Sequence, residues 1–209
     1  SQARAGLARD GRDGSELYVD ANHKPELLLP FIDFEVLAGL RSAEEARHVL
    51  NGLDHPLIAE AAGLMATSGV GEAFAHVLTL ADAQAVEEVV ALCAARRGEP
   101  DELTAQADAI VARLQEAFPG DRGVVASLML QVRTLPPGEA MFVPTGTVHA
   151  YLSGLGAEIM ANSDNVLRAG LTPKHVDVAE LLRVIDPESH PTIFHPPTSD
   201  QITRYPTPI

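Results

Sequence analysis

The spacing of apolar residues changes along this chain, and this change restricts the fold more than any other feature. Between residues 41 and 119, apolar side chains recur at every third or fourth position, which is the period of one helix face. From Val124 onwards, short aliphatic and β-branched runs alternate with Pro and Gly, which is typical of short strands and tight turns. The sequence therefore predicts an α+β protein in which the chain passes from helices to a sheet at Val124.

Two apolar series carry the helical period most clearly. One runs from Val86 to Cys93 and the other from Leu103 to Phe118. Ser42 and Glu45 have the spacing of a capping box, in which each side chain binds a free backbone N–H at the start of a helix. Stripes of this kind usually face a core, so we expect them to pack and to carry no chemistry. Cys93 is expected to be a packed core thiol.

Charge and hydropathy exclude several classes of function. The 209 residues are 46% hydrophobic, which is enough to bury one large core or two small ones. A formal net charge of −14, with no cluster of cations, would repel nucleic acid and anionic membranes. No apolar run approaches the ~20 residues of a membrane span. A phosphorylated small molecule stays open as a substrate, because one phosphate needs only one or two cations.

The two ends of the sequence and its cysteine content give weaker information. The first fifteen residues are polar and lack a signal-peptide pattern. A single cysteine cannot form an intrachain disulfide, so nothing requires an oxidising compartment. The proline-rich tail from residue 187 to 209 is expected to be an extended connector or an edge strand. We expect a cytoplasmic monomer whose sequence here is an interior piece of a longer protein.

The stretch "VDANHKPELLL", residues 19 to 29, places many polar groups directly before an aliphatic run. Two interpretations are open. The cluster is either a turn that leads into a buried element or one half of an active site, with Pro25 fixing the backbone between Lys24 and Glu26.

The stretch from Gly138 to His149 has a spacing that resembles the second motif of the cupin barrels. Gly138 would allow a tight hairpin entry, and Pro144 and Gly146 would form a sharp turn. The strand after the turn would then direct His149 into the barrel, where a metal ion can bind. A lone His on a strand is more often a hydrogen-bonded core residue, so this motif alone leaves both roles open.

A third polar stretch, "EIMANSDNVLRAGLTPKHVDV", lies between apolar segments. It brings Ser163, Asp164, Asn165 and Arg168 close together in sequence. A loop that satisfies its own backbone through Asx turns would also explain this composition.

Together, "NHKPE", "GEAMFVPTGTVHAYLSG" and "SDNVLRAGLTPKHVDV" resemble the type I mannose-6-phosphate isomerases. The similarity extends to "QARAGLARD", "DRGVVASLML" and "RYPTPI" elsewhere in the chain. The resemblance implies a zinc enzyme with a cupin-type β-barrel or jelly roll and an inserted all-helical subdomain. It implies an interconversion of mannose 6-phosphate and fructose 6-phosphate, feeding the metabolism of mannose and GDP-mannose. The partner would then be a small sugar phosphate, and one Zn²⁺ would bind per chain.

The resemblance also assigns roles to residues. Glu26 and His149 would be zinc ligands, and the remaining implied roles concern catalysis and substrate binding. The catalytic residues would be Arg168, Lys24 and His23, and the substrate contacts would be Tyr151, Asp164 and Lys174. The family's other two zinc ligands, a Gln and a His in a "QxHP" segment, are missing from this sequence.

The implied division of the chain has three parts. Residues 1–40 would be the cupin part with "NHKPE", and 41–119 the helical insertion. Residues 120–209 would be the cupin part with the other two motifs, incomplete at the C-terminus.

The chemistry of an aldose–ketose conversion agrees with these residue types. A proton moves between adjacent carbons through an enediol, which requires a base and positive charge near the developing oxyanion. Zinc with an open position and the forked guanidinium of Arg168 suit that charge. Lys24 and His23 both remain candidates for the proton transfer, and Lys174 is either a phosphate contact or a surface lysine. A non-catalytic sugar-binding cupin and a metal-dependent cupin oxygenase remain alternative functions.

Overall fold

The computed structural model describes residues 20, 22–96, 101–163, 165–173 and 176–195. These residues fall into two compact units. The sheet unit contains the described residues of 1–39, 133–167 and 184–209, and the helical unit contains those of 40–132 and 168–183. The chain crosses between the units four times: within the strands β2 and β3, between residues 167 and 168, and within the helix α8, whose bounds follow.

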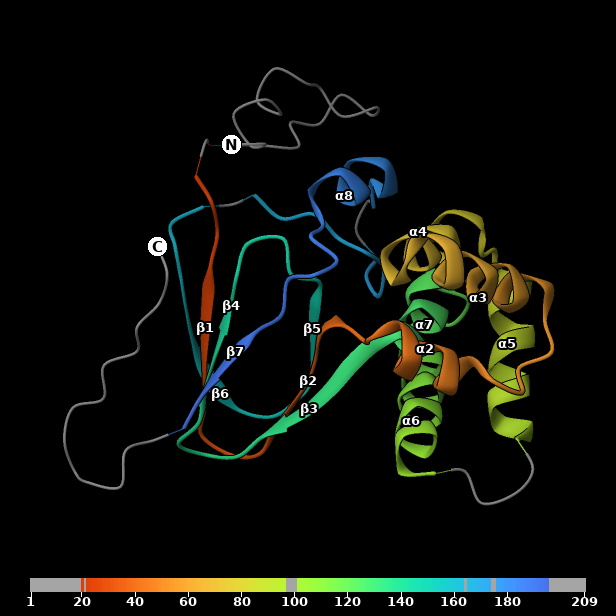
Figure 1. Cartoon of the computed structure of the whole chain (residues 1–209). Coiled ribbons are helices and arrows are strands. Elements are labelled where there is room, and N and C mark those ends of the chain that lie inside the picture. The colour runs from red at the N-terminus through yellow and green to blue at the C-terminus, as the bar shows by residue number, and fades with distance from the viewer. Residues whose placement is uncertain (1–19, 21, 97–100, 164, 174–175, 196–209) are drawn as a thin grey trace. The chain divides into compact units, whose positions relative to one another are not determined.

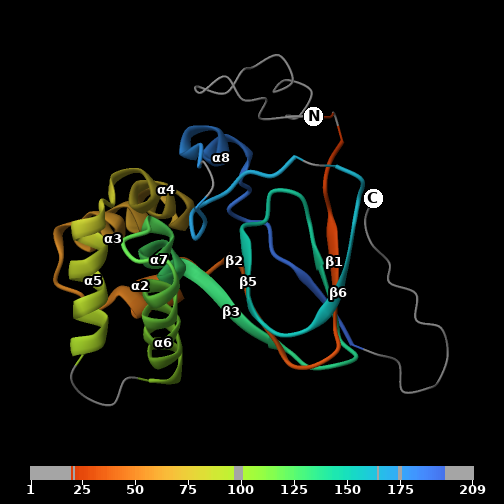
Figure 2. The ribbon, with the colours of Figure 1, turned by 180° about the vertical axis from the view of Figure 1, so that it is seen from behind.

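The sheet unit is built from antiparallel strands in two sheets (Figures 1 and 2). One sheet has the order β6-β1-β4-β7, and the other has the order β3-β2-β5. The proline-rich tail was expected to be an extended connector or an edge strand, and its described part contains β7, which lies at the edge of its sheet. The strands are β1 (Glu26–Pro30), β2 (Phe34–Leu40), β3 (Leu130–Leu135), β4 (Ala140–Val143), β5 (His149–Ser153), β6 (Gly156–Met160) and β7 (Thr192–Phe194).

The two sheets share one apolar core. Leu28 lies in the middle of β1, opposite Met141 of β4 and Glu158 of β6. Because side chains alternate along a strand, Glu26 lies on the same face of β1 as the buried Leu28. The carboxylate of Glu26 therefore lies at the start of β1, on the face of the strand that packs into the core. The buried cluster comprises Leu28, Phe34, Val36, Ala38, Leu135, Met141 and Val143, with Tyr151 and Ile193 packed against it.

The turn that precedes β5 has the predicted geometry. The N–H of Thr147 donates to the Pro144 carbonyl across 3.2 Å, which closes the turn. Gly146 has a φ of 92°, in the region that favours glycine. A Cβ at Gly146 would also lie 3.2 Å from the carbonyl oxygen of Val184. This turn delivers His149 at the first position of β5.

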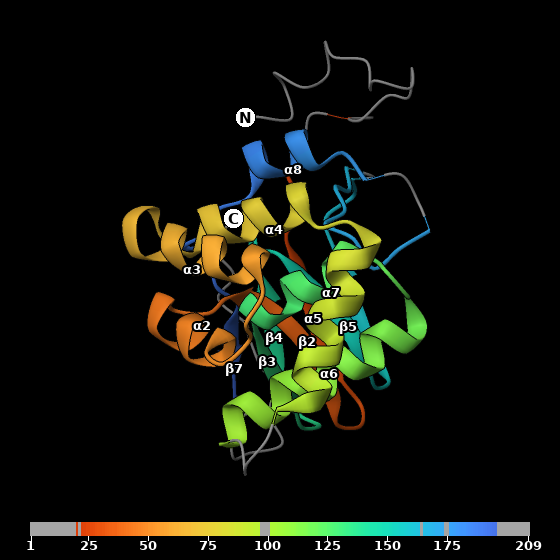
Figure 3. The ribbon, with the colours of Figure 1, turned by 90° about the vertical axis from the view of Figure 1, so that its right-hand side faces the viewer.

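The helical unit contains a series of consecutive helices (Figures 1 and 3). Helix α3 packs against α4, and α5 packs against α6 and α7. The expected stripes face the interior, since Val86, Val89 and Cys93 are buried. The helices are α2 (Ala43–Leu50), α3 (Pro56–Ser68), α4 (Val70–Leu80), α5 (Ala83–Ala95), α6 (Glu102–Ala117), α7 (Arg122–Ala126), the 3₁₀ helix η1 (Ser127–Met129) and α8 (Val178–Val184), whose last residue belongs to the sheet unit.

The capping box is confirmed, because Ser42 and Glu45 exchange both expected hydrogen bonds at the start of α2. The predicted change from helix to sheet at Val124 was wrong. Residues 122–129 form α7 and η1, and β3 begins only at Leu130. Residues 123–130 are all buried, and a helix that is apolar on every side has no visible period to distinguish it from a buried strand.

Arg41 joins the two ends of the segment 40–132 of the helical unit by hydrogen bonds. Its backbone N–H donates to the carbonyl of Met129 across 2.8 Å. Its Nε donates to the carbonyl of Leu128 across 3.2 Å, which links positions 87 residues apart. The side chain is almost fully buried, with 3% of its surface exposed.

Within the described part of the chain, every helix is too short or too polar to cross a lipid bilayer.

Candidate active site

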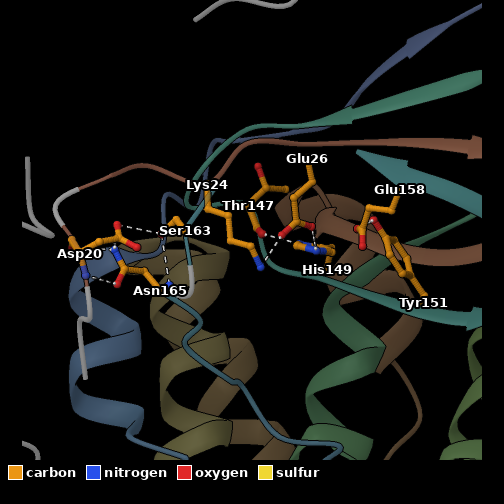
Figure 4. A network of polar contacts seen from close by, with 9 residues as sticks. All are labelled: Asp20, Lys24, Glu26, Thr147, His149, Tyr151, Glu158, Ser163 and Asn165. Carbon is orange, nitrogen blue, oxygen red and sulfur yellow. Dashed lines mark hydrogen bonds and ion pairs between the residues drawn. The ribbon is translucent and has the colours of Figure 1, made fainter. Parts of the chain in front are cut away.

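The "NHKPE" motif and the Gly138–His149 motif meet in the sheet unit (Figure 4). Glu26 begins β1 in one sheet, and His149 begins β5 in the other. The Glu26 Oε2 and His149 Nε2 atoms are 3.0 Å apart although 123 positions separate the residues. Only 11% of the Glu26 side chain and 27% of the His149 side chain are exposed. The structure thus brings together the two residues that were predicted to share a metal.

The second ring nitrogen of His149 is also bound. Nδ1 lies 3.0 Å from the carbonyl oxygen of Thr147, and a carbonyl can only accept, so Nδ1 carries a proton. A neutral His149 therefore has the lone pair on Nε2. This is the arrangement that orients metal-binding histidines, in which one nitrogen donates to a backbone oxygen while the other faces the metal.

Lys24 approaches the same carboxylate from the other side. Its Nζ lies 3.4 Å from Oε1 of Glu26, and Figure 4 shows Lys24 and His149 converging on Glu26. Burial alone would raise the pKa of Glu26, but the hydrogen bond and charge of His149 and the charge of Lys24 outweigh it and lower that pKa. Burial opposes the charged form of His149, yet the bonds to Glu26 and Thr147 raise its pKa overall. The site therefore stabilises the ionised form of Glu26, beside the ammonium of Lys24 and a His149 ring whose protonated form it also favours.

Tyr151 and Glu158 lie beside this group of residues. The Tyr151 hydroxyl donates to Oε1 of Glu158 across 2.5 Å, and burial together with Glu158 raises the pKa of Tyr151. The Tyr151 ring contacts Phe34 edge to face, and the centroids of the Tyr151 and His149 rings are 5.6 Å apart. Glu158 was not predicted from the sequence. A charged residue within the short strand "GAEIM" was the available signal, because β6 pairs it with Leu28 of β1, although Glu158 itself is exposed.

The remaining predicted residues are not all located near this group. His23 is exposed. Arg168 is half-buried and belongs to the helical unit, in a segment without regular secondary structure. Asp164 and Lys174 lie outside the described residues.

The Arg168 segment packs closely against the start of α7. A Cβ on Gly170 would lie 2.6 Å from Oδ1 of Asp121, the residue that caps α7. Leu171 adopts a φ of 55° and its side chain covers Gly123. Non-glycine residues rarely take that φ without a specific reason, so packing fixes the backbone that carries Arg168.

The donor types of Glu26 and His149 fit zinc, which binds carboxylate oxygen and imidazole nitrogen. They are only two ligands, and a catalytic zinc normally has three from the protein. Among the residues that the structure describes, no group of three or more His, Cys, Asp or Glu side chains is arranged to hold a metal ion. The two residues fit part of a zinc site and do not complete one.

Comparisons with known proteins show what the whole chain is similar to. No protein-family model matches the chain. The mannose-6-phosphate isomerase of Escherichia coli is 36% identical over 192 residues, which covers 90% of this chain and 47% of the relative. A variant of phosphomannose isomerase from Salmonella typhimurium matches with a TM-score of 0.75 and 33% identity, over 90% of this chain and 49% of that chain.

A mannose 6-phosphate isomerase bound with zinc and yttrium matches with a TM-score of 0.69 and 34% identity, over 90% of this chain and 47% of that chain. The chain thus spans about half the length of the curated relatives it matches. The α+β, cupin-type fold predicted from the sequence is confirmed. By sequence and by fold, the chain is therefore similar to mannose-6-phosphate isomerases over about half of their length.

Proposed function

We propose that this chain forms part of a zinc-dependent isomerase that interconverts mannose 6-phosphate and fructose 6-phosphate. The observation that carries the proposal is that Lys24 and His149, which come from two distant motifs, both contact the carboxylate of Glu26. The relatives named mannose-6-phosphate isomerase and the zinc-bound relative support the same assignment.

Glu26 and His149 would hold one Zn²⁺ per chain, with further ligands from outside this sequence. When bound, zinc would polarise the carbonyl and hydroxyl oxygens of the sugar. The bond between Nδ1 of His149 and Thr147 keeps the ring in the orientation and tautomer that this role requires.

The reaction needs one proton to leave C2 of open-chain mannose 6-phosphate and one to arrive at C1. The electron pair of the broken C2–H bond forms the C1–C2 double bond of an enediol, while the π pair of the C1 carbonyl moves to O1, which takes up a proton. O2 then loses its proton and forms the C2 carbonyl, as the C1–C2 π pair takes up a proton at C1. Lys24 and His23 are the candidates for the base. Lys24 is favoured by its position, because its Nζ lies beside Glu26 while His23 is exposed.

The other side chains would bind and orient the sugar. Tyr151 and Glu158 form a donor–acceptor pair, which is suited to a sugar hydroxyl. Arg168 would neutralise the developing oxyanion, because its guanidinium is always charged and presents several donors. Asp164 and Lys174 would contact the substrate, with Lys174 on the phosphate.

The test is an assay of the full-length protein with fructose 6-phosphate. The zinc-loaded protein is expected to produce mannose 6-phosphate, to lose activity with a chelator and to regain it with zinc. Sugar-phosphate binding without turnover would favour a binding cupin instead. Iron content with oxygen consumption would favour an oxygenase. Either result would refute the proposal.

A further inference from the structure

A second polar cluster lies next to the candidate site in the sheet unit. It joins the chain just before β1 to the chain just after β6, about 143 residues away in sequence (Figure 4). We call it the Asp20–Asn165 clasp, and it consists of Asp20, Asn22, Asn162, Ser163 and Asn165.

The centre of the clasp is one carboxylate oxygen. Oδ1 of Asp20 accepts from the Asn22 N–H at 2.7 Å, the Ser163 hydroxyl at 3.0 Å and Nδ2 of Asn165 at 3.1 Å. Three donors directed at one oxygen favour an ionised carboxylate, and bonds to a charged acceptor are about twice as strong as neutral ones. Ser163 is buried, with 7% of its surface exposed. Losing the acceptor would therefore leave a buried hydroxyl poorly satisfied.

Asn165 completes the link through its side-chain amide. Nδ2 also approaches the Asp20 carbonyl at 2.9 Å and the Asn22 carbonyl at 3.2 Å. Nδ2 of Asn22 donates in return to the Asn162 carbonyl at 3.2 Å. The two backbone segments are thus joined in both directions.

The clasp lies directly beyond the end of the hydrogen-bonded pairing between β1 and β6. The last paired positions are Glu26 and Met160, followed by one bond from the Ala161 N–H to the Pro25 carbonyl at 3.2 Å. Residues 22–25 and the described residues of 161–169 have no regular secondary structure. In these segments, hydrogen bonds of side chains join the two stretches of backbone, as backbone hydrogen bonds do in the strands.

The first of the two joined segments carries a proposed catalytic residue, because Lys24 follows Asn22 by two positions. We propose that the Asp20–Asn165 clasp is a positioning device of the sheet unit: it joins the backbone before Lys24 to the segment after β6 and thereby fixes Lys24 for the isomerisation. This inference depends on the proposed isomerase function. Misplacing a reacting group by about 1 Å can reduce a rate about 100-fold, so a modest loosening of the clasp should be visible in turnover.

The experiment uses the zinc-loaded, full-length protein with Asp20→Asn and Asn165→Ala, and Asp33→Asn as control. Asp33 is an exposed carboxylate in the same unit, in the turn between β1 and β2. We expect kcat to fall about 10-fold for Asp20→Asn and about 10- to 100-fold for Asn165→Ala. KM, zinc content and Tm should change little, and Asp33→Asn should resemble the wild type.

A graded pair separates positioning from folding. Ser163→Thr keeps the hydroxyl and should retain most of the turnover, whereas Ser163→Ala removes one of the three donors and should lower kcat. Hydrogen exchange should become faster in residues 22–25 and 161–167 of the Asp20→Asn and Asn165→Ala variants.

Unchanged kcat in both clasp variants would overturn the proposal. So would a loss of activity that only follows a loss of zinc or of folded protein, or an effect on KM alone. An inactive wild type would instead refute the proposed function. In that case, the exchange measurement still decides the clasp, since unchanged exchange in both variants would show that it fixes neither segment.

Discussion

Two of the histidine–carboxylate pairs among the described residues, one in each unit, have nearly equal lengths but different surroundings. In the sheet unit, Nε2 of His149 lies 3.0 Å from Glu26, and in the helical unit Nε2 of His55 lies 3.1 Å from Glu88. The second ring nitrogen distinguishes them. Nδ1 of His55 accepts from the Leu57 N–H at the start of α3, so the proton of a neutral ring must be on Nε2. A neutral His149 ring has the opposite tautomer, because its Nδ1 donates to a carbonyl.

The two pairs therefore have different capacities. A neutral His55 has both nitrogens committed, one to the helix N-terminus and one to a carboxylate whose side chain is 51% exposed. His149 can offer the Nε2 lone pair to a metal beside a carboxylate that is only 11% exposed. Distance alone does not identify a ligand. The partner of the second nitrogen and the burial of the carboxylate do.

The largest effect is expected when the carboxylate charge is removed from the His149–Glu26 pair, and the same change in the His55–Glu88 pair serves as the comparison. Glu26→Gln in the full-length protein should lose zinc and at least about 1,000-fold of the isomerase activity, because one ligand of an already sparse set is weakened. Glu88→Gln should keep both. Metal analysis and a coupled assay on the two variants test this difference. Retention of zinc and turnover by Glu26→Gln would remove the basis for treating the pairs as different.

A second comparison concerns two arginines. Arg168→Ala should keep its zinc but lose about 100- to 1,000-fold in kcat, because the guanidinium would act mainly on the charge of the transition state. Arg122 binds the Leu78 carbonyl at 2.6 Å within the helical unit. Arg122→Ala should keep kcat and lose about 1–2 kcal/mol of unfolding free energy. Kinetics and denaturant titration distinguish the two. Near-normal turnover of Arg168→Ala would make Arg168 a structural residue.

A smaller effect is expected from the capping role of His55. His55→Ala should lower the free energy of unfolding by about 1 kcal/mol, because the Leu57 N–H loses its partner. His55→Asn should recover most of that loss, since Asn is a preferred N-cap. Neither substitution should change zinc content. Urea unfolding of the three proteins measures the difference, and equal midpoints would contradict the role in capping.

The smallest effect concerns Cys93 in α5. Burial raises the pKa of its thiol from 9.0 to about 12. The folded state therefore holds the proton that the unfolded chain releases near pH 9. Stability from this group is complete below pH 9 and is lost as the pH rises from 9 to 12. At pH 10 the wild type should have lost about 1 kcal/mol more than Cys93→Ala, relative to pH 8. Parallel pH dependence of the two proteins would contradict this assignment.

The sequence predicted those parts of the molecule in which local patterns and tertiary structure agree. The capping box at Ser42 and the inward-facing Val86 and Val89 follow from spacing alone. The helix at residues 122–126 could not be predicted, because residues 123–126 are all buried and leave no apolar period. Glu158 was missed for a related reason, since its importance comes from a cross-strand position opposite Leu28 and not from a motif.

The site was partly predictable because the resemblance named residues that are distant in sequence. Nothing local indicated that Glu26 and His149 would touch, or that Thr147 would fix the tautomer. Those features depend on register and turn geometry, which the sequence specifies only through the folded structure. The roles of Lys24 and Arg168 remain predictions.

The hydrogen bonds of Arg41 to Leu128 and Met129 have a consequence for the order of folding. Strands β2 and β3 are neighbours in one sheet although nearly the whole first segment of the helical unit separates them along the chain. Closing a loop of that length before the helices form would carry a large entropic penalty, and contacts between distant positions form slowly. Helices form from local contacts, and the bonds of Arg41 to Leu128 and Met129 then hold the chain crossings in β2 and β3 together. We therefore expect the helices to assemble early and to shorten the search by which β2 finds β3, so that a region without assigned chemistry sets the rate at which the chemical site appears.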